Sequence, residues 1–170
     1  LSENPDLDFV HADELYDDVL IGEFVMRPLR IQDNLTPNIG RGMPYRHQTM
    51  VVRRIIYDKV GSFDLKYVTS DYDWTCRWEA SLTGNDGRAY YFQGNPVVKM
   101  QGGGVSVTQE WKVMLEAVEI IRTHFPNNIE IKFSFFKRFI LFGGRKLLNW
   151  LQLGNILSQL KRQKYQKVDY

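Results

Sequence analysis

The segment MPYRHQTMVVRRIIYDKVGSFDLKYVTSDYDW, residues 43–74, is the stretch of this chain that says most about its fold. Apolar and β-branched residues at 48–53 predict a strand, and residues 54–60 predict a short helix that ends at Gly61. Ser70 is a suitable N-cap for a second helix over residues 71–81, which has two acids in its first turn. The segment therefore places one strand and two short helices next to each other.

Further elements are predicted on both sides of this segment. Residues 108–125 form the clearest helix, because Trp111, Leu115 and Val118 recur at helical spacing. Asn, Pro and Gly make residues 31–44 a loop or short helix, and residues 84–87 a turn. Strands are predicted from β-branched and aromatic composition at residues 8–12, with a continuation after a bend, and at 22–27, 89–92 and 96–100.

Composition places the chain among ordinary globular proteins. Hydrophobic residues make up 44% and charged residues 25% of its 170 residues, which excludes wholesale disorder and fits one domain. Cys76 is the only cysteine, so a disulfide scaffold and a cysteine-based zinc site are excluded within one chain, and a reducing compartment fits best. No signal peptide is predicted after Leu1 and no run of about 18 apolar residues predicts a transmembrane helix.

Charge divides the chain into two parts. Residues 1–128 carry 13 Lys and Arg against 18 Asp and Glu, a net charge of −5. Residues 129–170 carry 9 against 2, a net charge of +7. We therefore predict an acidic part at 1–128 that holds the site, followed by a separate basic tail at 129–170.

The tail alternates large apolar and basic side chains over residues 132–167. We read it as amphipathic helices at 133–148 and 155–165, with Gly143-Gly144 and Gly154 as breaks. Such a helix suits the surface of an anionic membrane, although its apolar face could instead pack on the acidic part, on another part of the protein or on a second copy. A nucleic-acid partner is not expected, because the basic residues alternate with large apolar ones.

The segment TSDYDWTCRW, residues 69–78, holds the main candidates for chemistry. Asp71 and Asp73 open a helix, and since residues i and i+2 point in different directions they would not share a proton. We expect one of them to face a cleft and the other to cap or pair, with Arg77 four residues after Asp73 as a partner. A simpler reading stays open, because the helix dipole alone favours acids in a first turn.

Two further segments carry residues that suit a ligand. The glycines of QGGGVS, residues 101–106, let a backbone approach a ligand and let a loop move, unless this is a plain connector. Residues 41–54 hold four arginines and His47. Arginine forks suit phosphates and carboxylates, although surface pairing with acids and a structural histidine are equally simple readings.

Two acidic patterns near the start of the chain are weaker candidates. Asp6 and Asp8 match an Asp-x-Asp metal pattern, but they lie before the first strand beside a proline turn and should face solvent. His11 and Asp13 lie on one face of a strand and could reach a cleft together, or form a satisfied pair on an edge strand.

Taken together, residues 41–124 resemble family 2 glycosyltransferases of the GT-A fold, in particular bacterial cell-surface polysaccharide enzymes of the colanic-acid type. Residues 43–74 look like that family's order of His-Gln, apolar strand, Arg-Arg, helix, Gly-x-Phe-Asp and Asp-Tyr-Asp. The motifs NPVV at 95–98, GGVS at 103–106 and IRTH at 121–124 follow in family order. NPDLDFV at residues 4–10 looks like the family's segment just past its metal motif, so the resemblance covers residues 3–125.

The resemblance implies a fold and a set of site residues. The fold would be α/β, the C-terminal part of a GT-A domain with a Rossmann-like mixed sheet flanked by helices, followed by amphipathic helices. Asp71 falls on the general base that deprotonates the acceptor hydroxyl, with Ser70 where the family has Glu. The positions implied for binding or orienting the acceptor and donor are Asp73, Arg77, His47, Gln48, Trp74, Gly103, Gly104, Val105 and Ser106, and the aromatic residues Tyr67, Tyr72 and Trp111 are further candidates for the acceptor cleft.

The resemblance also implies an activity. The full enzyme would transfer a sugar, with inversion, from a nucleotide-diphosphate sugar to a saccharide or lipid-linked acceptor, using Mg²⁺ or Mn²⁺, in the cytoplasm or on the inner face of the membrane. The family's nucleotide-binding half, with its metal motif, has no match in residues 1–170. We therefore expect an acceptor-side half that has no metal site and is inactive without the missing N-terminal half. The alternative is a non-catalytic module that binds carbohydrate or a membrane surface.

Overall fold

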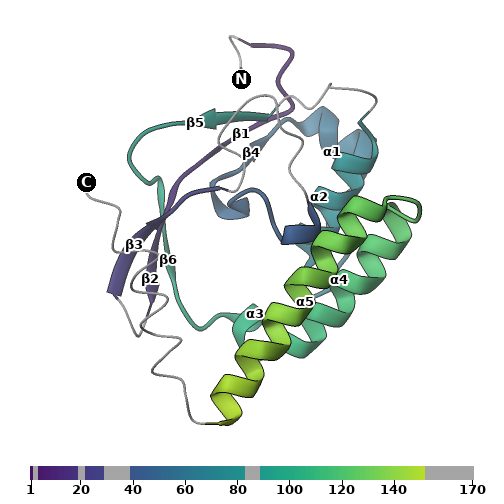
Figure 1. The fold of residues 1–170 in the computed structure, drawn as a ribbon. Coiled ribbons are helices and arrows are strands. Elements are labelled where there is room, and N and C mark those ends of the chain that lie inside the picture. Colours follow the sequence, from purple (N-terminus) through teal and green to yellow (C-terminus); the bar gives the residue numbers. More distant parts are fainter. Residues whose placement is uncertain (2–3, 19–21, 29–38, 83–88, 152–170) are drawn as a thin grey trace.

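A computed structural model describes residues 1, 4–18, 22–28, 39–82 and 89–151 of the chain. This part is a mixed α/β structure, with strands on one side and helices on the other (Figure 1). The strands are β1 (Phe9–Ala12), β2 (Glu14–Asp18), β3 (Gly22–Met26), β4 (Val51–Val52), β5 (Ala89–Phe92) and β6 (Val98–Gln101). The helices are η1 (Ile39–Arg41), η2 (His47–Thr49), α1 (Arg54–Val60), α2 (Ser70–Ala80), α3 (Val105–Thr108), α4 (Glu110–His124) and α5 (Ile129–Trp150).

The strands form two small mixed sheets, and the chain passes between them more than once. β1 lies between β4, which is antiparallel to it, and β5, which is parallel. β2 lies between antiparallel β3 and parallel β6. Only Asp13 separates β1 from β2, so the predicted continuation of the first strand after a bend is confirmed.

Helix α2 is buried on two faces and joins two parts of the core. Tyr72 and Cys76 lie four residues apart and pack in one cluster with α4 and α5, while Trp74 and Trp78 pack in another with β1 and α1. Residues four apart share a face of a helix, so α2 presents two apolar stripes. Helix α2 therefore contacts α4 and α5 through one face and β1 and α1 through the other.

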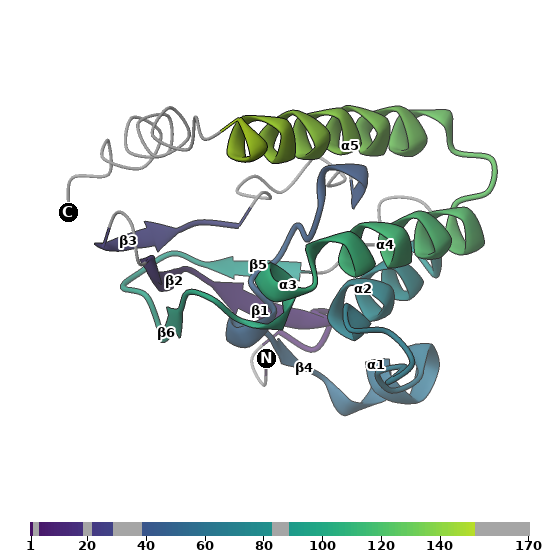
Figure 2. The same ribbon diagram turned by 90° about the horizontal axis from the view of Figure 1, so that it is seen from below.

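Seen from below, α5 forms the outermost helical layer, with α4 and α2 between it and α1 (Figure 2). Phe135 and Phe142 of α5 are buried in the cluster shared with α2 and α4. Residues 129–150 thus pack on the acidic part of the chain, with the boundary at residue 128 falling immediately before the helix. The predicted break at Gly143-Gly144 is wrong, because α5 continues through both glycines. The helix predicted at 155–165 and the turn predicted at 84–87 lie outside the described residues.

The segment at 43–74 differs from its prediction in two details. The strand expected at 48–53 is shorter than predicted: residues 48 and 49 belong to the short helix η2, and only Val51 and Val52 pair with β1. Thr49 explains the difference: its hydroxyl donates to the carbonyl of Ala12 and accepts from the amide of that residue, and these two bonds attach the segment to β1 through a side chain. Helix α1 has its predicted bounds and ends at Gly61, which has a positive φ of 89°.

The helix predicted at 108–125 is confirmed as α4, which spans Glu110–His124 and is preceded by the short helix α3. The buried stripe of α4 is displaced from the predicted spacing. Trp111 and Leu115 are more than half exposed, and the buried apolar side chains of α4 are Met114, Ala117, Ile120 and Ile121.

Candidate functional site

A cleft of about 600 Å³ lies where β2, the loop before η2, the start of α2 and the start of α3 meet, and we call it the Asp71 cleft. Five of the residues that the resemblance assigns to catalysis or binding line it together: Asp71, His47, Gln48, Gly104 and Val105. Of the aromatic candidates, Tyr72 is the one among its lining residues, and its hydroxyl donates to the carbonyl of Ile39 at 2.7 Å.

Asp71 and His47 form a hydrogen-bonded pair at this cleft. Nδ1 of His47 lies 2.9 Å from Oδ2 of Asp71, and about a quarter of the Asp71 side chain is exposed. Burial acts to raise the pKa of Asp71, but the hydrogen bond and charge of His47, together with backbone amides at the start of α2, outweigh it and hold that pKa below its ordinary value. Asp71 is therefore an ionised, accessible carboxylate at neutral pH.

Asp73 points away from the cleft, into the protein. Its side chain accepts from Nε of Arg77 at 2.9 Å and lies 3.0 Å from Nε2 of His124. Arg77 also donates to the carbonyls of Val60 and Ser62. The predicted division of the two acids, one at a cleft and one paired with Arg77, is confirmed. Asp73 and Arg77 anchor α2 to α1 and α4, and neither lines the cleft.

Trp74 is also internal. It is almost fully buried in the cluster with Phe9 and Trp78, and its indole nitrogen donates to the carbonyl of Gly61. Trp74 therefore does not line the cleft. Of the other aromatic candidates, Tyr67 donates to Glu119, and Trp111 packs edge-on against Phe142 of α5.

The start of α2 is fixed by an acid from another helix. Ser70 was expected to be the N-cap, but Thr69 takes that position and its side chain does not cap α2. The buried carboxylate of Glu116 in α4 instead accepts from the backbone amides of Val68 and Thr69 and from the Thr69 hydroxyl. This contact joins residues far apart in sequence, so local motifs gave no signal of it. It sets the position of Asp71, which lies two residues after Thr69.

The glycine-rich segment reaches the cleft at one end. Gly103 has a φ of 90°, which favours glycine, and Gly104 precedes the short helix α3. Gly104 and Val105 line the cleft, whereas Gly103 is not among its lining residues. Ser106 lies in α3, and its side chain is outside the described part of the structure.

Glu14 is a second acid in the cleft that sequence reasoning did not identify. It lies at the start of β2, only 3% exposed, and its Oε2 has no hydrogen-bond partner in the described structure. Burial raises its pKa, which the nearby charges of Arg46 and His47 lower only in part. A buried acid that lines a cleft and keeps one oxygen unpaired suits contact with a hydroxyl of a bound ligand.

A divalent cation has no evident place among the described residues, which contain no group of three or more His, Cys, Asp or Glu side chains that could hold a metal ion. Oδ2 of Asp8 accepts from the indole nitrogen of Trp78, so this residue of the Asp-x-Asp pattern is half-buried and structural instead of facing solvent. Asp13 accepts from the Tyr91 hydroxyl, and His11 packs against Tyr45 and Tyr91, so both belong to the sheet and not to the cleft.

Comparison with known proteins adds nothing to this geometry, since no family model, no curated protein and no solved structure matches the chain. Within the described residues, no helix combines the length and apolar character needed to cross a membrane.

Proposed function

We propose that the Asp71 cleft is the acceptor side of an inverting, nucleotide-sugar-dependent glycosyltransferase with the GT-A fold, acting in cell-surface polysaccharide synthesis. The observation that carries this proposal is the His47–Asp71 pair at the cleft. It joins an ionised carboxylate to an orienting imidazole, and both belong to the motifs that resemble this family. Asp73 and Arg77 pair with each other away from the cleft and attach α2 to α1 and α4.

The chemistry requires one base near the acceptor hydroxyl. Asp71 would take the hydroxyl proton as the acceptor oxygen forms a bond to the anomeric carbon, while the bond from that carbon to the diphosphate breaks on the opposite side. A carboxylate with a lowered pKa stays ionised and available for this step. His47, at 2.9 Å, fixes which oxygen of Asp71 remains free to face the acceptor.

The donor is proposed to be a nucleotide-diphosphate sugar, with Mg²⁺ or Mn²⁺ as the metal of the full enzyme. The described residues do not form a site for that metal, so no step of the mechanism is assigned to it here. Gly104 and Val105 line the cleft together with the His47 segment, and the lack of a side chain at Gly104 would let the backbone approach a sugar closely.

The test is sugar transfer by the product of the complete open reading frame, assayed with a panel of nucleotide sugars. Asp71→Asn should lower the transfer rate by about 100-fold or more, because a general base contributes about 10²–10⁴-fold. Asp58→Asn is the matched control, since Asp58 is an exposed acid on α1. Undiminished transfer by Asp71→Asn would refute the assignment of Asp71 as the general base. Saccharide binding by a wild-type protein that transfers no sugar would favour the non-catalytic module.

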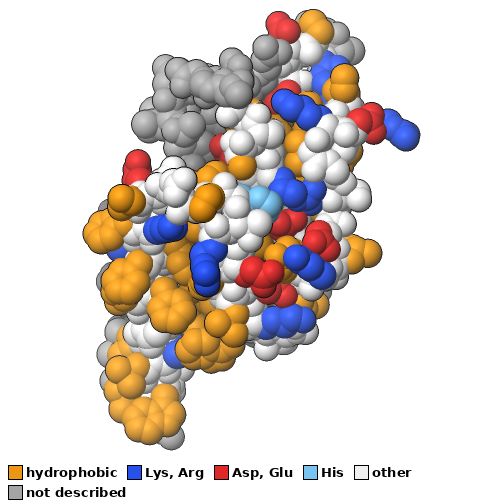
Figure 3. Space-filling model, turned by 90° about the vertical axis from the view of Figure 1, so that its right-hand side faces the viewer, with side chains coloured by type: hydrophobic (Ala, Val, Ile, Leu, Met, Phe, Trp, Pro, Cys, Tyr) orange, Lys and Arg blue, Asp and Glu red, His pale blue; other side chains and the backbone are white. Residues whose placement is uncertain are grey.

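We also propose that the protein works at an anionic membrane surface, with α5 as the contact. The face of α5 opposite its buried side carries Ile129, Phe133, Phe136, Ile140 and Leu147, each more than half exposed. Hydrophobic side chains gather, with Lys and Arg beside them, on the lower part of the face in Figure 3. Basic side chains beside an exposed apolar face suit the interface of an anionic bilayer.

A further inference from the structure

Two residues that line the Asp71 cleft carry a buried polar atom with no hydrogen-bond partner in the described part of the chain. These atoms are Oε2 of Glu14, at the start of β2, and Nη1 of Arg138, in α5. Buried polar groups are nearly always hydrogen-bonded, so an unpaired one needs an explanation. One atom accepts and the other donates, and both belong to the same cleft, so a single bound ligand can satisfy both.

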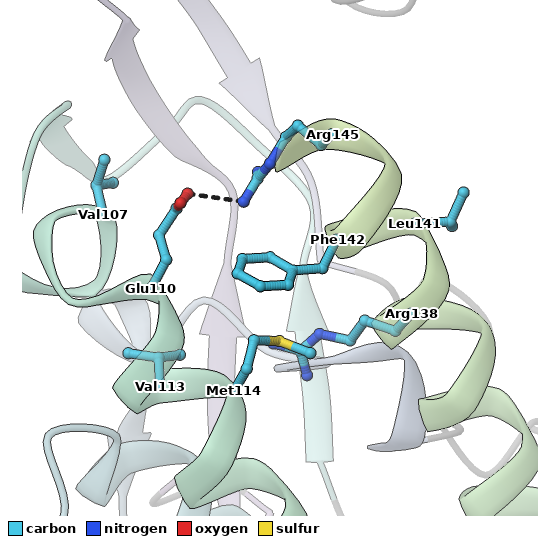
Figure 4. A pocket seen from close by; sticks show the side chains of 8 residues that line it. All are labelled: Val107, Glu110, Val113, Met114, Arg138, Leu141, Phe142 and Arg145. Atoms are coloured by element: carbon cyan, nitrogen blue, oxygen red, sulfur yellow. Dashed lines mark hydrogen bonds and ion pairs between the residues drawn. The ribbon is translucent and has the colours of Figure 1, made fainter. Parts of the chain in front are cut away.

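Arg138 reaches the cleft from α5. Figure 4 shows its side chain in the pocket between α4 and α5, extending toward α4. Cζ of Arg138 lies 5.9 Å from the centroid of the Tyr72 ring, and a Cβ added at Gly42 would lie 3.5 Å from the same atom. Arg145 in the same pocket differs, because it pairs with Glu110 at 2.7 Å. The Arg138 guanidinium is therefore a positioned cation that can still bind an anion.

The charges around the cleft favour a ligand with one negative charge. Arg46 also lines the cleft, but its guanidinium donates to the carbonyl of Arg27. Asp71 is ionised, whereas burial raises the pKa of Glu14 and favours its neutral form. A phosphate dianion would bring two negative charges into the cleft that holds the Asp71 carboxylate. A carboxylate brings one, and its two oxygens match the geometry of a guanidinium.

We propose that the Asp71 cleft selects a sugar that bears a carboxylate, a uronic acid, with its carboxylate on Arg138 and one of its hydroxyls on Glu14. Arg138 and Glu14 are then specificity-determining residues, and Asp71 keeps its role as the base. This inference rests on the proposed function, which leaves the sugar in the cleft open, and it gives that sugar a charge. A neutral sugar would leave the buried N–H of Arg138 without an anionic partner, which is unfavourable.

The test measures binding to the purified 170-residue chain by isothermal titration. Methyl glucuronide and methyl galacturonide are each compared with their carboxamides, which keep the shape of the sugar and lose its charge. At least one uronide should bind about tenfold more tightly than its amide, because hydrogen bonds between charged groups are the stronger ones. Acetate, which has no hydroxyl for Glu14, should bind more weakly than that uronide. Equal affinity of each uronide and its amide, binding of neither, or tighter binding of glucose 6-phosphate would overturn the proposal.

Variants of Arg138 test the contact with the carboxylate. Arg138→Met should remove the preference for the uronide over its amide, and Arg138→Lys, which keeps the charge, should retain part of it if the methionine variant does not fold. Lys137→Met is the matched control, since Lys137 is the neighbouring exposed base of α5. A preference that persists in Arg138→Met would overturn the assignment.

Variants of Glu14 test the contact with the hydroxyl. Glu14→Ala should weaken uronide and amide alike, about tenfold, and leave the preference between them unchanged. Glu14→Gln, which keeps an acceptor oxygen, should restore part of both affinities, and unchanged affinities in Glu14→Ala would exclude this contact. The titrations require no sugar transfer, so the two proposals can fail separately. A chain that prefers uronides and transfers no sugar would refute the proposed function alone, and transfer without this preference would refute only the uronic acid.

Discussion

His47 is the residue that sets the protonation state of Asp71. Its hydrogen bond and charge lower the pKa of a carboxyl that burial alone would raise. Asp71 therefore contributes stability at pH values above its ordinary pKa of 3.8, and this contribution is lost as pH falls through its lower folded pKa.

We predict that His47→Ala raises the pKa of Asp71, because burial then acts with less opposition. Titration of the Asp71 carboxyl carbon by ¹³C NMR measures the shift directly. Gln48→Ala is the control, since Gln48 lines the same cleft and is not among the groups that shift this pKa. The difference in unfolding free energy between wild type and His47→Ala should shrink as pH falls and vanish below the lowered folded pKa of wild-type Asp71, where Asp71 is protonated in both. An unchanged Asp71 titration would contradict the assigned role of His47.

At the level of single residues, the sequence predicted which way a side chain points better than which distant residue it contacts. The i and i+2 spacing correctly separated Asp71 from Asp73, because helical geometry alone decides which way each points. Glu14 and Glu116 were missed, since each acts through a contact with a distant segment. Trp74 was expected at a cleft, but its i+4 relation to Trp78 places it in the core.

Among the elements, α5 differs most from its prediction. Gly143 and Gly144 each lower helix stability by about 1 kcal/mol relative to alanine, which favoured a break. Buried Phe142 just before them and the Arg145–Glu110 pair just after them attach both sides to α4, and this packing outweighs the local preference. The sequence showed that α5 is amphipathic, but it could not show that one apolar face packs inward while a second one stays exposed.

The exposed face of α5 should control membrane binding. We use vesicles of equal parts phosphatidylcholine and phosphatidylglycerol. The double variant Phe136→Asp/Ile140→Asp should reduce flotation with them by roughly tenfold, because two charges replace apolar side chains that would be buried in the membrane interface. Leu65→Asp/Ile55→Asp is the matched control, as both leucine and isoleucine are exposed but lie outside α5. Binding should also fall with added salt, which screens the basic side chains. Equal flotation of both double variants would exclude α5 as the membrane contact.

At the scale of the whole molecule, the sequence predicted the mixture of strands and helices and most of their bounds, but not how they join. The parallel pairs β1–β5 and β2–β6 bring together segments between which η1, η2, α1 and α2 lie in sequence, and periodicity reports only local structure. The charge boundary at residue 128 was correct as a change in composition. It is not a boundary of the core, because Phe135 and Phe142 share a cluster with Tyr72 and Ile120.

Since α5 completes the core, the described part of the chain should unfold as one unit. Phe135→Ala should lower the free energy of unfolding by about 3 kcal/mol, because it leaves a cavity against α2 and α4. Phe136→Ala, at the neighbouring exposed phenylalanine, should change it little. Urea unfolding of a Trp111→Phe/Trp150→Phe background, in which Trp74 and Trp78 alone fluoresce, should then show coincident transitions by helical circular dichroism and by fluorescence, and the two should shift together. A fluorescence transition that Phe135→Ala leaves in place would show instead that residues 129–150 fold separately from the part that holds Asp71.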